Sequence, residues 1–232
     1  MPPSIVSTAD GTDTLFHKVY GQTYHSRHGA LAEAQHVFLD ATGVARRLAA
    51  RMETRVLEVG FGTGFNALLT AKMAQVHEAP LVFVSLEREF LPTATFAALN
   101  HGAVLDAAPL AEALAAWRRS QPEEQVTPGR YAVTLAPQAV LDLHVGEATD
   151  AVLPASAFDA VYLDAFSPDV NPELWTLVFL RRLLNALLPG GRLATYSAKG
   201  SVRRALMSAG FEVERRPGPP GKREMLVGLR PT

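Results

Sequence analysis

One acid and three glycines are closely spaced where a strand of residues 55–60 is expected to meet a helix of residues 65–75. They are Glu58, Gly60, Gly62 and Gly64, in the stretch LEVGFGTG. Glycines at such a junction allow a tight turn and bring backbone N–H groups against a ligand. The spacing differs from the G-x-G-x-x-G of dinucleotide sites, and no P-loop lysine is present. A carboxylate beside the loop repels a pyrophosphate and attracts a cation. The loop, with Phe61 inside it, predicts a site for the cationic S-adenosylmethionine.

Two further acids follow predicted strands of the same series. Glu87 ends a strand predicted at residues 81–87, where a carboxylate can accept hydrogen bonds from both ribose hydroxyls. Glu147 follows a strand predicted at 139–145 and is placed to meet the adenine amino group. Glu147 has an alternative interpretation, as an acid that complements a helix dipole, worth about 0.3–1 kcal/mol. Both interpretations of Glu147 stay open.

Asp164 is the candidate catalytic residue. It stands near the end of a strand predicted at residues 160–166, at the edge where open α/β sheets bind ligands. Methyl transfer from a sulfonium needs an uncharged nucleophile held in line. If that nucleophile is an amine, a carboxylate can orient it and accept its proton.

Aromatic and imidazole side chains near these acids are candidate substrate contacts. Phe166, Pro168 and Trp175 follow Asp164, and a Phe and a Trp beside the site could stack a nucleobase, at about 1–3 kcal/mol per base. Packing of Trp175 in the core is the open alternative. Tyr24 and His25 belong to an N-terminal YHSRHG stretch. Zinc needs four ligands, or three and water, so we favour a lid, an acceptor pocket or packing over a metal site.

The elements that must position these residues alternate between apolar strands and helices from Arg55 onward, which predicts a mostly parallel sheet covered on both faces. Residues 211–216 and 222–229 read as two strands of a closing antiparallel hairpin. This combination is typical of the Rossmann-like α/β fold of class I methyltransferases. We expect residues 1–54 to form an extension or lid and residues 55–232 one domain, with a helical insertion at about 102–138. A helix is predicted over 172–188, ended by Pro189, Gly190 and Gly191.

Composition excludes several classes of protein. The 232 residues include no cysteine, which excludes disulfides, thiolate nucleophiles and cysteine metal sites. No apolar run approaches the 18 residues of a membrane span, and the first residues do not read as a signal peptide, so a cytoplasmic location is expected.

The net charge of −1 conceals a strong asymmetry. Residues 1–180 hold 11 Lys and Arg against 20 Asp and Glu, a net of −9, whereas residues 181–232 hold 11 against 3, a net of +8. One basic end is an electrostatic footprint for phosphate. Its candidate substrate-binding residues are Lys199, Arg203, Arg204, Arg216, Lys222 and Arg223.

The chain resembles the methyltransferase part of the MnmC family, bacterial enzymes of tRNA 5-methylaminomethyl-2-thiouridine formation, in their stand-alone form. The motifs that carry the resemblance are TLFHKVYGQTYHSRHGALAEAQHVFL, RVLEVGFGTGFNALLT, LDLHVGEA, FDAVYLDAFSPDVNPELWT and the final GKREML. The DAFSP–NPELW block, the YHS–HG–E–HVF stretch and GKREML are more specific than the glycine loop.

The resemblance implies a methyltransferase that uses S-adenosylmethionine on the aminomethyl nitrogen at carbon 5 of the wobble uridine, in the tRNA anticodon region. Glu58, Gly60, Gly62, Gly64, Glu87 and Glu147 fall on the family's cofactor motifs, and Asp164 on its catalytic acid. Bifunctional members add a flavin-dependent oxidase domain, and the 232 residues end before the position of that domain. We therefore expect no FAD and no metal, and a separate protein as the source of the aminomethyl-uridine precursor.

Two other functions remain open on sequence grounds. One keeps the fold and changes the acceptor, giving a small-molecule amine methyltransferase or an aminopropyltransferase. The other is a non-catalytic RNA-binding module, against which the intact glycine loop, Glu87 and Asp164 argue.

Overall fold

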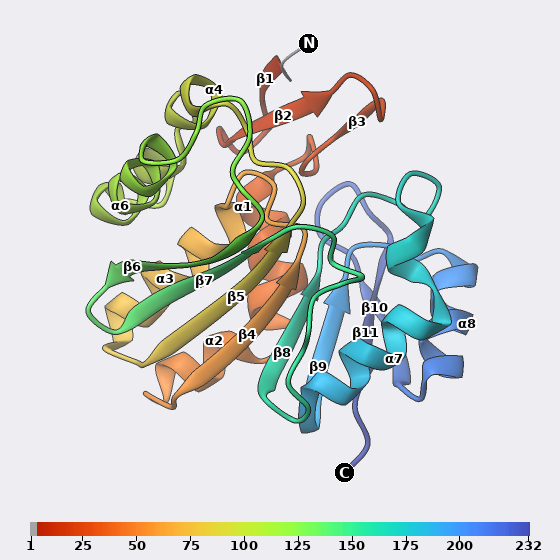
Figure 1. Ribbon diagram of the computed structural model, residues 1–232. Coiled ribbons are helices and arrows are strands. Elements are labelled where there is room, and N and C mark those ends of the chain that lie inside the picture. Colours follow the sequence, from red (N-terminus) through yellow and green to blue (C-terminus); the bar gives the residue numbers. More distant parts are fainter. Residues whose placement is uncertain (1–3) are drawn as a thin grey trace.

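The computed structural model describes residues 4–232 and places an eight-stranded sheet at their centre, in the order β10-β11-β9-β8-β4-β5-β7-β6 (Figure 1). In chain order the strands are β4 (Thr54–Val59), β5 (Leu81–Glu87), β6 (Gly129–Ala136), β7 (Ala139–Val145), β8 (Phe158–Leu163), β9 (Leu187–Thr195), β10 (Glu212–Pro217) and β11 (Glu224–Leu229). The five central strands run parallel, while β10, β11 and β6 are antiparallel to their neighbours. The predicted parallel sheet and closing hairpin are confirmed.

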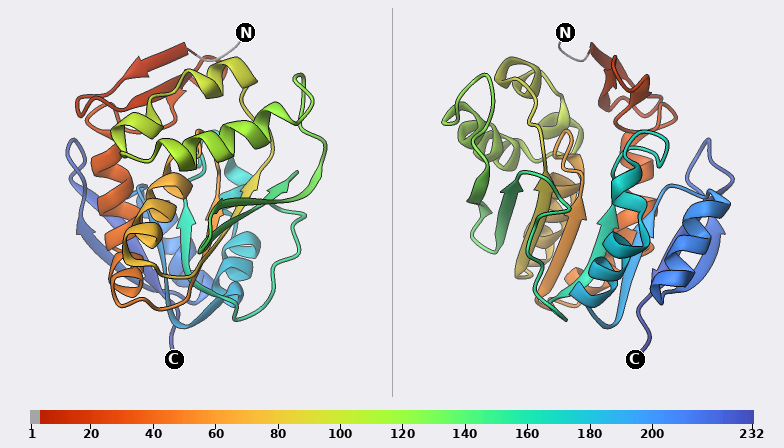
Figure 2. Two further views of the ribbon diagram at one scale, coloured as in Figure 1. Left: turned by 90° about the vertical axis from the view of Figure 1, so that its left-hand side faces the viewer. Right: turned by 45° about the vertical axis from the view of Figure 1, so that its right-hand side comes forward.

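Helices cover both faces of this sheet (Figure 2). The π-helix η1 (Ala34–Asp40), α2 (Val44–Ala49) and α3 (Phe65–His77) pack on one face, and α7 (Leu177–Ala186) and α8 (Gly200–Ala209) on the other. Each face of the sheet has its own hydrophobic core. Within β4, Val56 belongs to the core shared with η1, α2 and α3, whereas Leu57 and Val59 belong to the core shared with α7 and α8. Because successive side chains of a strand alternate, the apolar run of β4 fills both cores.

The N-terminal segment forms a small antiparallel sheet of its own. Its strands are β1 (Ser4–Ser7), β2 (Asp13–His17) and β3 (Gln22–Thr23), and the short helix α1 (Ala30–Glu33) follows. This sheet lies above the carboxyl ends of the parallel strands (Figure 1). Gln22 Nε2 donates to Ser167 Oγ at 2.8 Å, which ties the small sheet to the loop after β8.

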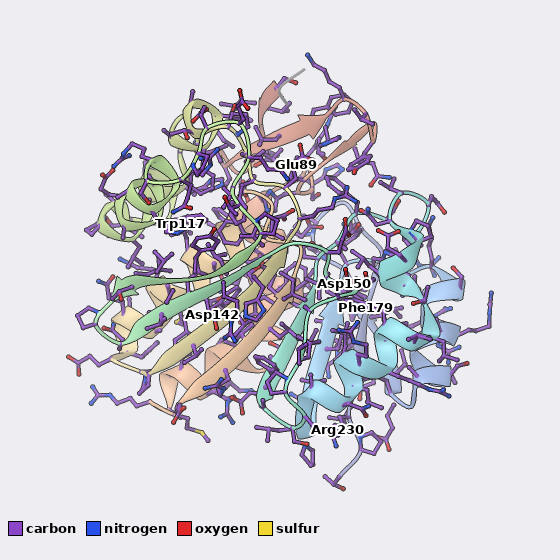
Figure 3. The ribbon with its side chains drawn as sticks, viewed as in Figure 1. Glu89, Trp117, Asp142, Asp150, Phe179 and Arg230 are labelled. Carbon is purple, nitrogen blue, oxygen red and sulfur yellow. The ribbon has the colours of Figure 1, made fainter. Side chains whose placement is uncertain are left out.

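The inserted region is helical at first but ends in a strand. Helices α4 (Thr93–Ala97), α5 (His101–Val104) and α6 (Ala108–Arg119) are followed by β6, which pairs with β7 at the sheet edge. The insertion predicted to be helical at about 102–138 therefore also contains strand β6. Trp117 of α6, labelled in Figure 3, packs edge-on against Tyr131 of β6, at 5.6 Å between ring centroids, and both rings pack against the core on one face of the sheet.

The helix predicted over 172–188 is two shorter elements. A 3-10 helix, η2 (Pro172–Trp175), stops at Thr176, whose backbone is extended and whose Oγ1 caps α7 by accepting from Phe179 N. A hydroxyl cap of this kind marks the start of a new helix, so α7 is not a continuation of η2. Pro189, Gly190 and Gly191 lie inside β9, so the predicted stop signal falls within a strand. In residues 4–232 no helix has the length and apolar character needed to cross a membrane.

Candidate active site

A cavity of about 1150 Å³ lies at the carboxyl ends of the parallel strands. The loops after β4, β5, β7 and β8 form its floor, and residues 16–27 of the N-terminal segment cover it. This is the edge where open α/β sheets bind ligands. Most of the residues that the sequence singled out lie on this cavity: Gly60, Phe61, Gly62, Glu87, Glu147, Asp164, Tyr24, His25, Phe166 and Lys222.

The glycine loop approaches the cavity with bare backbone. Gly60 has φ +94°, and a Cβ there would lie 2.9 Å from the carbonyl oxygen of Asp164. Gly62 has φ +53°, and its Cβ would lie 2.9 Å from the Tyr24 ring. Gly64 begins α3 with φ +77°. Side chains larger than hydrogen would therefore strain the turn and fill the space next to the helix N-terminus.

Glu87 is fixed by the same loop. Its carboxylate accepts hydrogen bonds from the backbone N–H of Gly62 at 3.0 Å, Arg88 at 2.8 Å and Glu89 at 2.9 Å. Burial raises the pKa of Glu87, and the backbone donors oppose that rise. The end of β5 thus presents an oriented carboxylate to the cavity, as a hydroxyl-rich ligand requires.

Glu58 lies beneath the cavity and not on its wall. Its side chain has no exposed surface, and it accepts from Ser85 Oγ at 2.6 Å and Asn66 Nδ2 at 3.0 Å. Burial raises the pKa of Glu58 to about 8. Glu58 does not line the cavity, so the predicted direct attraction of a cationic ligand is corrected: Glu58 instead holds Asn66, the residue two positions after the glycine loop.

Asp164 shares Asn66 with Glu58. The same amide nitrogen donates to Asp164 Oδ2 at 2.8 Å, so one asparagine joins both carboxyls. Burial raises the pKa of Asp164 well above its usual value, and the nearby carboxyls of Glu33 and Glu58 raise it further. An acid with a raised pKa can take up a proton from a bound amine near neutral pH.

Glu147 lies half exposed at the mouth of the cavity, 3.7 Å from Arg88. Residues 148–150 form a turn and not a helix, so the helix-dipole alternative for Glu147 does not apply. Contact between Glu147 and a bound adenine stays a prediction.

Aromatic side chains from two parts of the chain meet at the cavity. Tyr24 and Phe166 pack edge to face with ring centroids 5.1 Å apart, and Tyr20 and His17 stack at 4.1 Å beside them. Trp175 does not join this group. Its side chain is 6% exposed in the core against β8, and its Nε1 donates to the carbonyl of Phe166. Predicted base stacking by Trp175 is corrected to packing, and Pro168 also lies off the cavity lining.

His25 is buried against Phe65 and shares a hydrogen bond of 3.1 Å with Thr14 Oγ1. Burial lowers the pKa of His25 to about 4, so the ring is neutral at pH 7. Within residues 4–232 no group of three or more His, Cys, Asp or Glu is placed to hold a metal ion.

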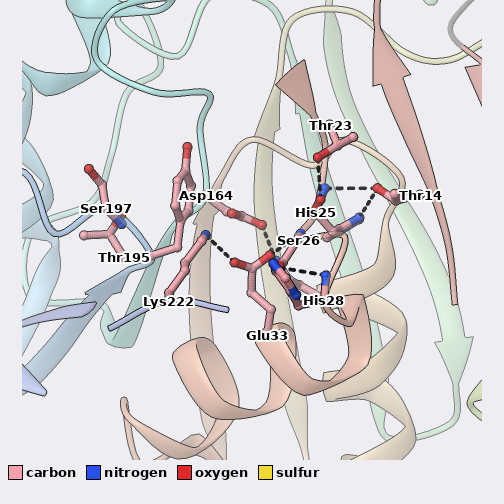
Figure 4. Close-up of polar contacts among 12 residues, drawn as sticks. Thr14, Thr23, His25, Ser26, His28, Glu33, Asp164, Thr195, Ser197 and Lys222 are labelled. Atoms are coloured by element: carbon pink, nitrogen blue, oxygen red, sulfur yellow. Dashed lines mark hydrogen bonds and ion pairs between the residues drawn. The ribbon is translucent and has the colours of Figure 1, made fainter. Parts of the chain in front are cut away.

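Asn66 and Glu33 are among the side chains at the site that were not found from the sequence. Asn66 follows the glycine loop, and Glu33 ends α1, where its carboxylate meets Lys222 Nζ at 2.5 Å (Figure 4). Neither residue type nor spacing marks them, because each acts on a partner far away in the chain.

The other predicted basic residues lie outside the cavity lining. Lys199 pairs with Asp169, and Arg216 with Glu214 at 2.6 Å. Arg203 and Arg204 lie on α8, and Arg223 is exposed between β10 and β11. Contact with nucleic acid by these five stays a prediction.

The groups that line the cavity fit S-adenosylmethionine. Gly60 and Gly62 leave space that any Cβ would fill, Glu87 offers a fixed carboxylate, and Phe61 offers an apolar wall. The N-terminus of α3 and the acids Glu87 and Asp164 surround a region suited to a ligand that is both zwitterionic and cationic.

Comparison with known proteins agrees with this site. A family model described as S-adenosyl-L-methionine-dependent methyltransferase matches residues 109–231. The chain is 39% identical over 234 residues to the "tRNA 5-methylaminomethyl-2-thiouridine biosynthesis bifunctional protein MnmC" of Aromatoleum aromaticum, covering 98% of this chain and 35% of that protein. The protein of the same description from Ralstonia nicotianae is also 39% identical, with 96% and 34% covered. The chain thus spans about a third of the length of these relatives.

Solved structures extend the comparison. The crystal structure of MnmC2 from Aquifex aeolicus superposes with a TM-score of 0.75 at 28% identity, covering 99% of this chain and 71% of that one. Spermidine synthase from Thermotoga maritima, at 13% identity and TM-score 0.50, shares the fold alone. The predicted resemblance and the class I fold are confirmed. The chain belongs to the S-adenosyl-L-methionine-dependent methyltransferases.

Proposed function

We propose that this methyltransferase acts on tRNA, at the aminomethyl nitrogen on carbon 5 of the wobble uridine, and forms 5-methylaminomethyl-(2-thio)uridine. The observation that carries the proposal is the position of Asp164, an acid that directly follows β8 and lines the same cavity as the glycine loop. The relatives described as acting in tRNA 5-methylaminomethyl-2-thiouridine biosynthesis support the choice of acceptor.

Each part of the site has a role in this reaction. S-adenosylmethionine, held by the glycine loop and Glu87, supplies a methyl group on a positively charged sulfur. Asp164 accepts a hydrogen bond from the acceptor nitrogen, orients its lone pair and takes up its proton. Tyr24 and Phe166 offer ring faces and edges to the uridine base. The small N-terminal sheet above the cavity restricts access of water.

The basic end of the chain serves tRNA docking in this proposal. Arg203 and Arg204 project from α8 and make no ion pair with any of residues 4–232. Free guanidinium groups of this kind bind phosphates and make affinity fall steeply with salt. The wobble base would leave the anticodon stack to reach the cavity, at a cost of a few kcal/mol.

The chemistry also defines what else the pathway needs. Methyl transfer to an amine consumes an aminomethyl group and does not create one, so we propose that a separate activity supplies the precursor. Transfer from a sulfonium is not an oxidation or reduction, so this step needs no FAD.

A comparison of acceptors tests the proposal. The protein and S-adenosylmethionine are incubated with tRNA bearing 5-aminomethyl-2-thiouridine, with the same tRNA lacking the aminomethyl group, and with free alkylamines. We expect a methylated wobble nucleoside, detected by mass spectrometry, only with the first. Methylation of free amines without RNA would favour the small-molecule alternative. Aminopropyl transfer from decarboxylated S-adenosylmethionine would favour the polyamine type.

A further inference from the structure

The ammonium group of Lys222 projects into the cavity from the loop between β10 and β11. Its Nζ lies 2.5 Å from Glu33 Oε1 and 4.1 Å from the centroid of the Tyr196 ring. A carboxylate on one side and an aromatic face on the other are the two groups that bind an ammonium best. Lys222, Glu33 and Asp164 converge on one space in Figure 4.

Both partners of Lys222 are held rigidly. Glu33 is 5% exposed, and its other oxygen accepts from the backbone N–H of Ser26 at 2.7 Å. The Tyr196 hydroxyl donates to the carbonyl of Ala165 at 3.0 Å, directly after Asp164. The ring therefore bridges β9 and the loop after β8, and the ammonium has a fixed position beside the candidate catalytic acid.

The loop that carries Lys222 is itself clasped to the N-terminal segment. Gly221 packs so closely on His28 that a Cβ at this glycine would overlap the imidazole ring. His36 Nε2 donates to the carbonyl of Pro217 at 2.8 Å. The hairpin loop is thus a built part of the cavity wall and not a free surface loop.

The Lys222 ammonium balances one carboxyl of the cavity but not both. Lys222 pairs with Glu33, which leaves Asp164 as the carboxyl that faces the acceptor. The other titratable groups nearby are His25, which burial keeps neutral, the phenol of Tyr196, and Glu58 behind Asn66; His28 and Asp10 lie on the N-terminal side. An acceptor entering as an ammonium would meet the like charge of Lys222, whereas a neutral amine would not.

We propose that Lys222 is a positioning residue that acts through Glu33 and Asp164. By neutralising Glu33, its fixed positive charge keeps the cavity from stabilising the ammonium form of the acceptor, so that the nitrogen meets Asp164 as the neutral amine, the form that has a lone pair for attack. This inference rests on the proposed amine acceptor. It adds a device for selecting the protonation state of the nucleophile.

The pH dependence of the single-turnover methylation rate, with enzyme and S-adenosylmethionine in excess over tRNA, tests the proposal. Lys222→Met leaves Glu33 unpaired and favours the ammonium, so the acid limb should move up by about one pH unit. Glu33→Gln leaves Lys222 unbalanced, so the limb should move down. The double variant should return near wild type, and Lys222→Arg, which keeps the charge, should resemble wild type.

Opposite shifts from two members of one pair cannot arise from a shared loss of structure. Arg51→Met and Glu78→Gln remove an exposed ion pair between a residue before β4 and the residue that follows α3, and control for net charge. Calorimetric binding of S-adenosylmethionine and thermal unfolding check that each variant is folded. Shifts of both variants in the same direction, or no shift in either, would overturn the inference. An inactive wild type would instead contradict the proposed function.

Discussion

The side-chain amide nitrogen of Asn66 lies 2.8 Å from a carboxylate oxygen of Asp164, so the helix after the glycine loop holds the acid that directly follows β8. The same amide holds the buried Glu58 at 3.0 Å. Glu58, which precedes the glycine loop, and Asp164, the candidate catalytic acid, are therefore joined by hydrogen bonds to one asparagine.

Asn66→Ala should lower the methylation rate by about 10- to 100-fold, less than the loss of a general base itself. Hydrogen bonding to a carboxylate favours its charged form, so removing Asn66 raises the pKa of Asp164 further. The deficit should therefore shrink between pH 7 and pH 9, as rate measurements at both values will detect. Thr70→Ala, one turn along α3, removes a hydroxyl bonded to the Asn66 carbonyl and serves as the control. An equal deficit at both pH values would contradict the role in setting the charge of Asp164.

Gly60→Ala should weaken S-adenosylmethionine binding by about tenfold or more and destabilise the fold by about 1–3 kcal/mol. The positive φ and the 2.9 Å approach to the Asp164 carbonyl both oppose a Cβ, and neither backbone can move cheaply. Gly190→Ala is the matched control, because Gly190 has φ +77° but nothing within 4 Å. Calorimetry and chemical denaturation measure the two effects. Similar cofactor affinity in both variants would show that the close approach does not matter.

Replacing His101 by Phe should stabilise the protein by about 1–3 kcal/mol at pH 7. Both ring nitrogens of His101 are buried without a partner among the described residues, next to a cavity of about 320 Å³ that can admit the larger ring. Burial lowers the pKa of His101 to about 3, far below its ordinary 6.5. The unfolded chain therefore binds a proton that the folded chain does not, and stability falls as the pH drops below 6.5.

The advantage of His101→Phe should thus grow from pH 7 to pH 5 in urea unfolding curves. His77→Phe, at the end of α3, is the control and should gain no such advantage. A constant difference between His101→Phe and wild type across this range would show that His101 does not titrate as a buried neutral ring.

Much of this architecture follows from local sequence, and the exceptions have physical reasons. Glu87 and Asp164 could be placed because the ends of parallel strands share one edge of a sheet. Strand β6 was missed because its apolar alternation lies beside a Pro/Gly-rich stretch, and only pairing with β7 stabilises it. Trp175 was ambiguous, since one aromatic residue on a short helix can face either way.

The contacts of Asn66 and Glu33 were beyond sequence reasoning. Their partners Asp164 and Lys222 are 98 and 189 residues away along the chain. Such pairs depend on how whole elements pack, and no local pattern encodes them.

Charge reversal at Arg203 and Arg204 should weaken tRNA binding and reduce the slope of log affinity against log salt by about 1 for each phosphate that the variant no longer binds. Both side chains lie on α8, away from the cavity lining, so S-adenosylmethionine binding should not change. Arg119→Glu, on α6, is the control for the net charge of each single reversal. An unchanged salt slope in the double variant would place the tRNA on another face.

Transfer of an isotopically labelled methyl group from S-adenosylmethionine to the wobble nucleoside, compared between wild type and Asp164→Asn, tests the central claim most directly. The wild-type protein should place the label on the aminomethyl nitrogen of the tRNA. Asp164→Asn should lose about 10²–10⁴-fold in rate while binding S-adenosylmethionine as wild type does. Label on another nucleoside, or wild-type transfer by Asp164→Asn, would contradict the account.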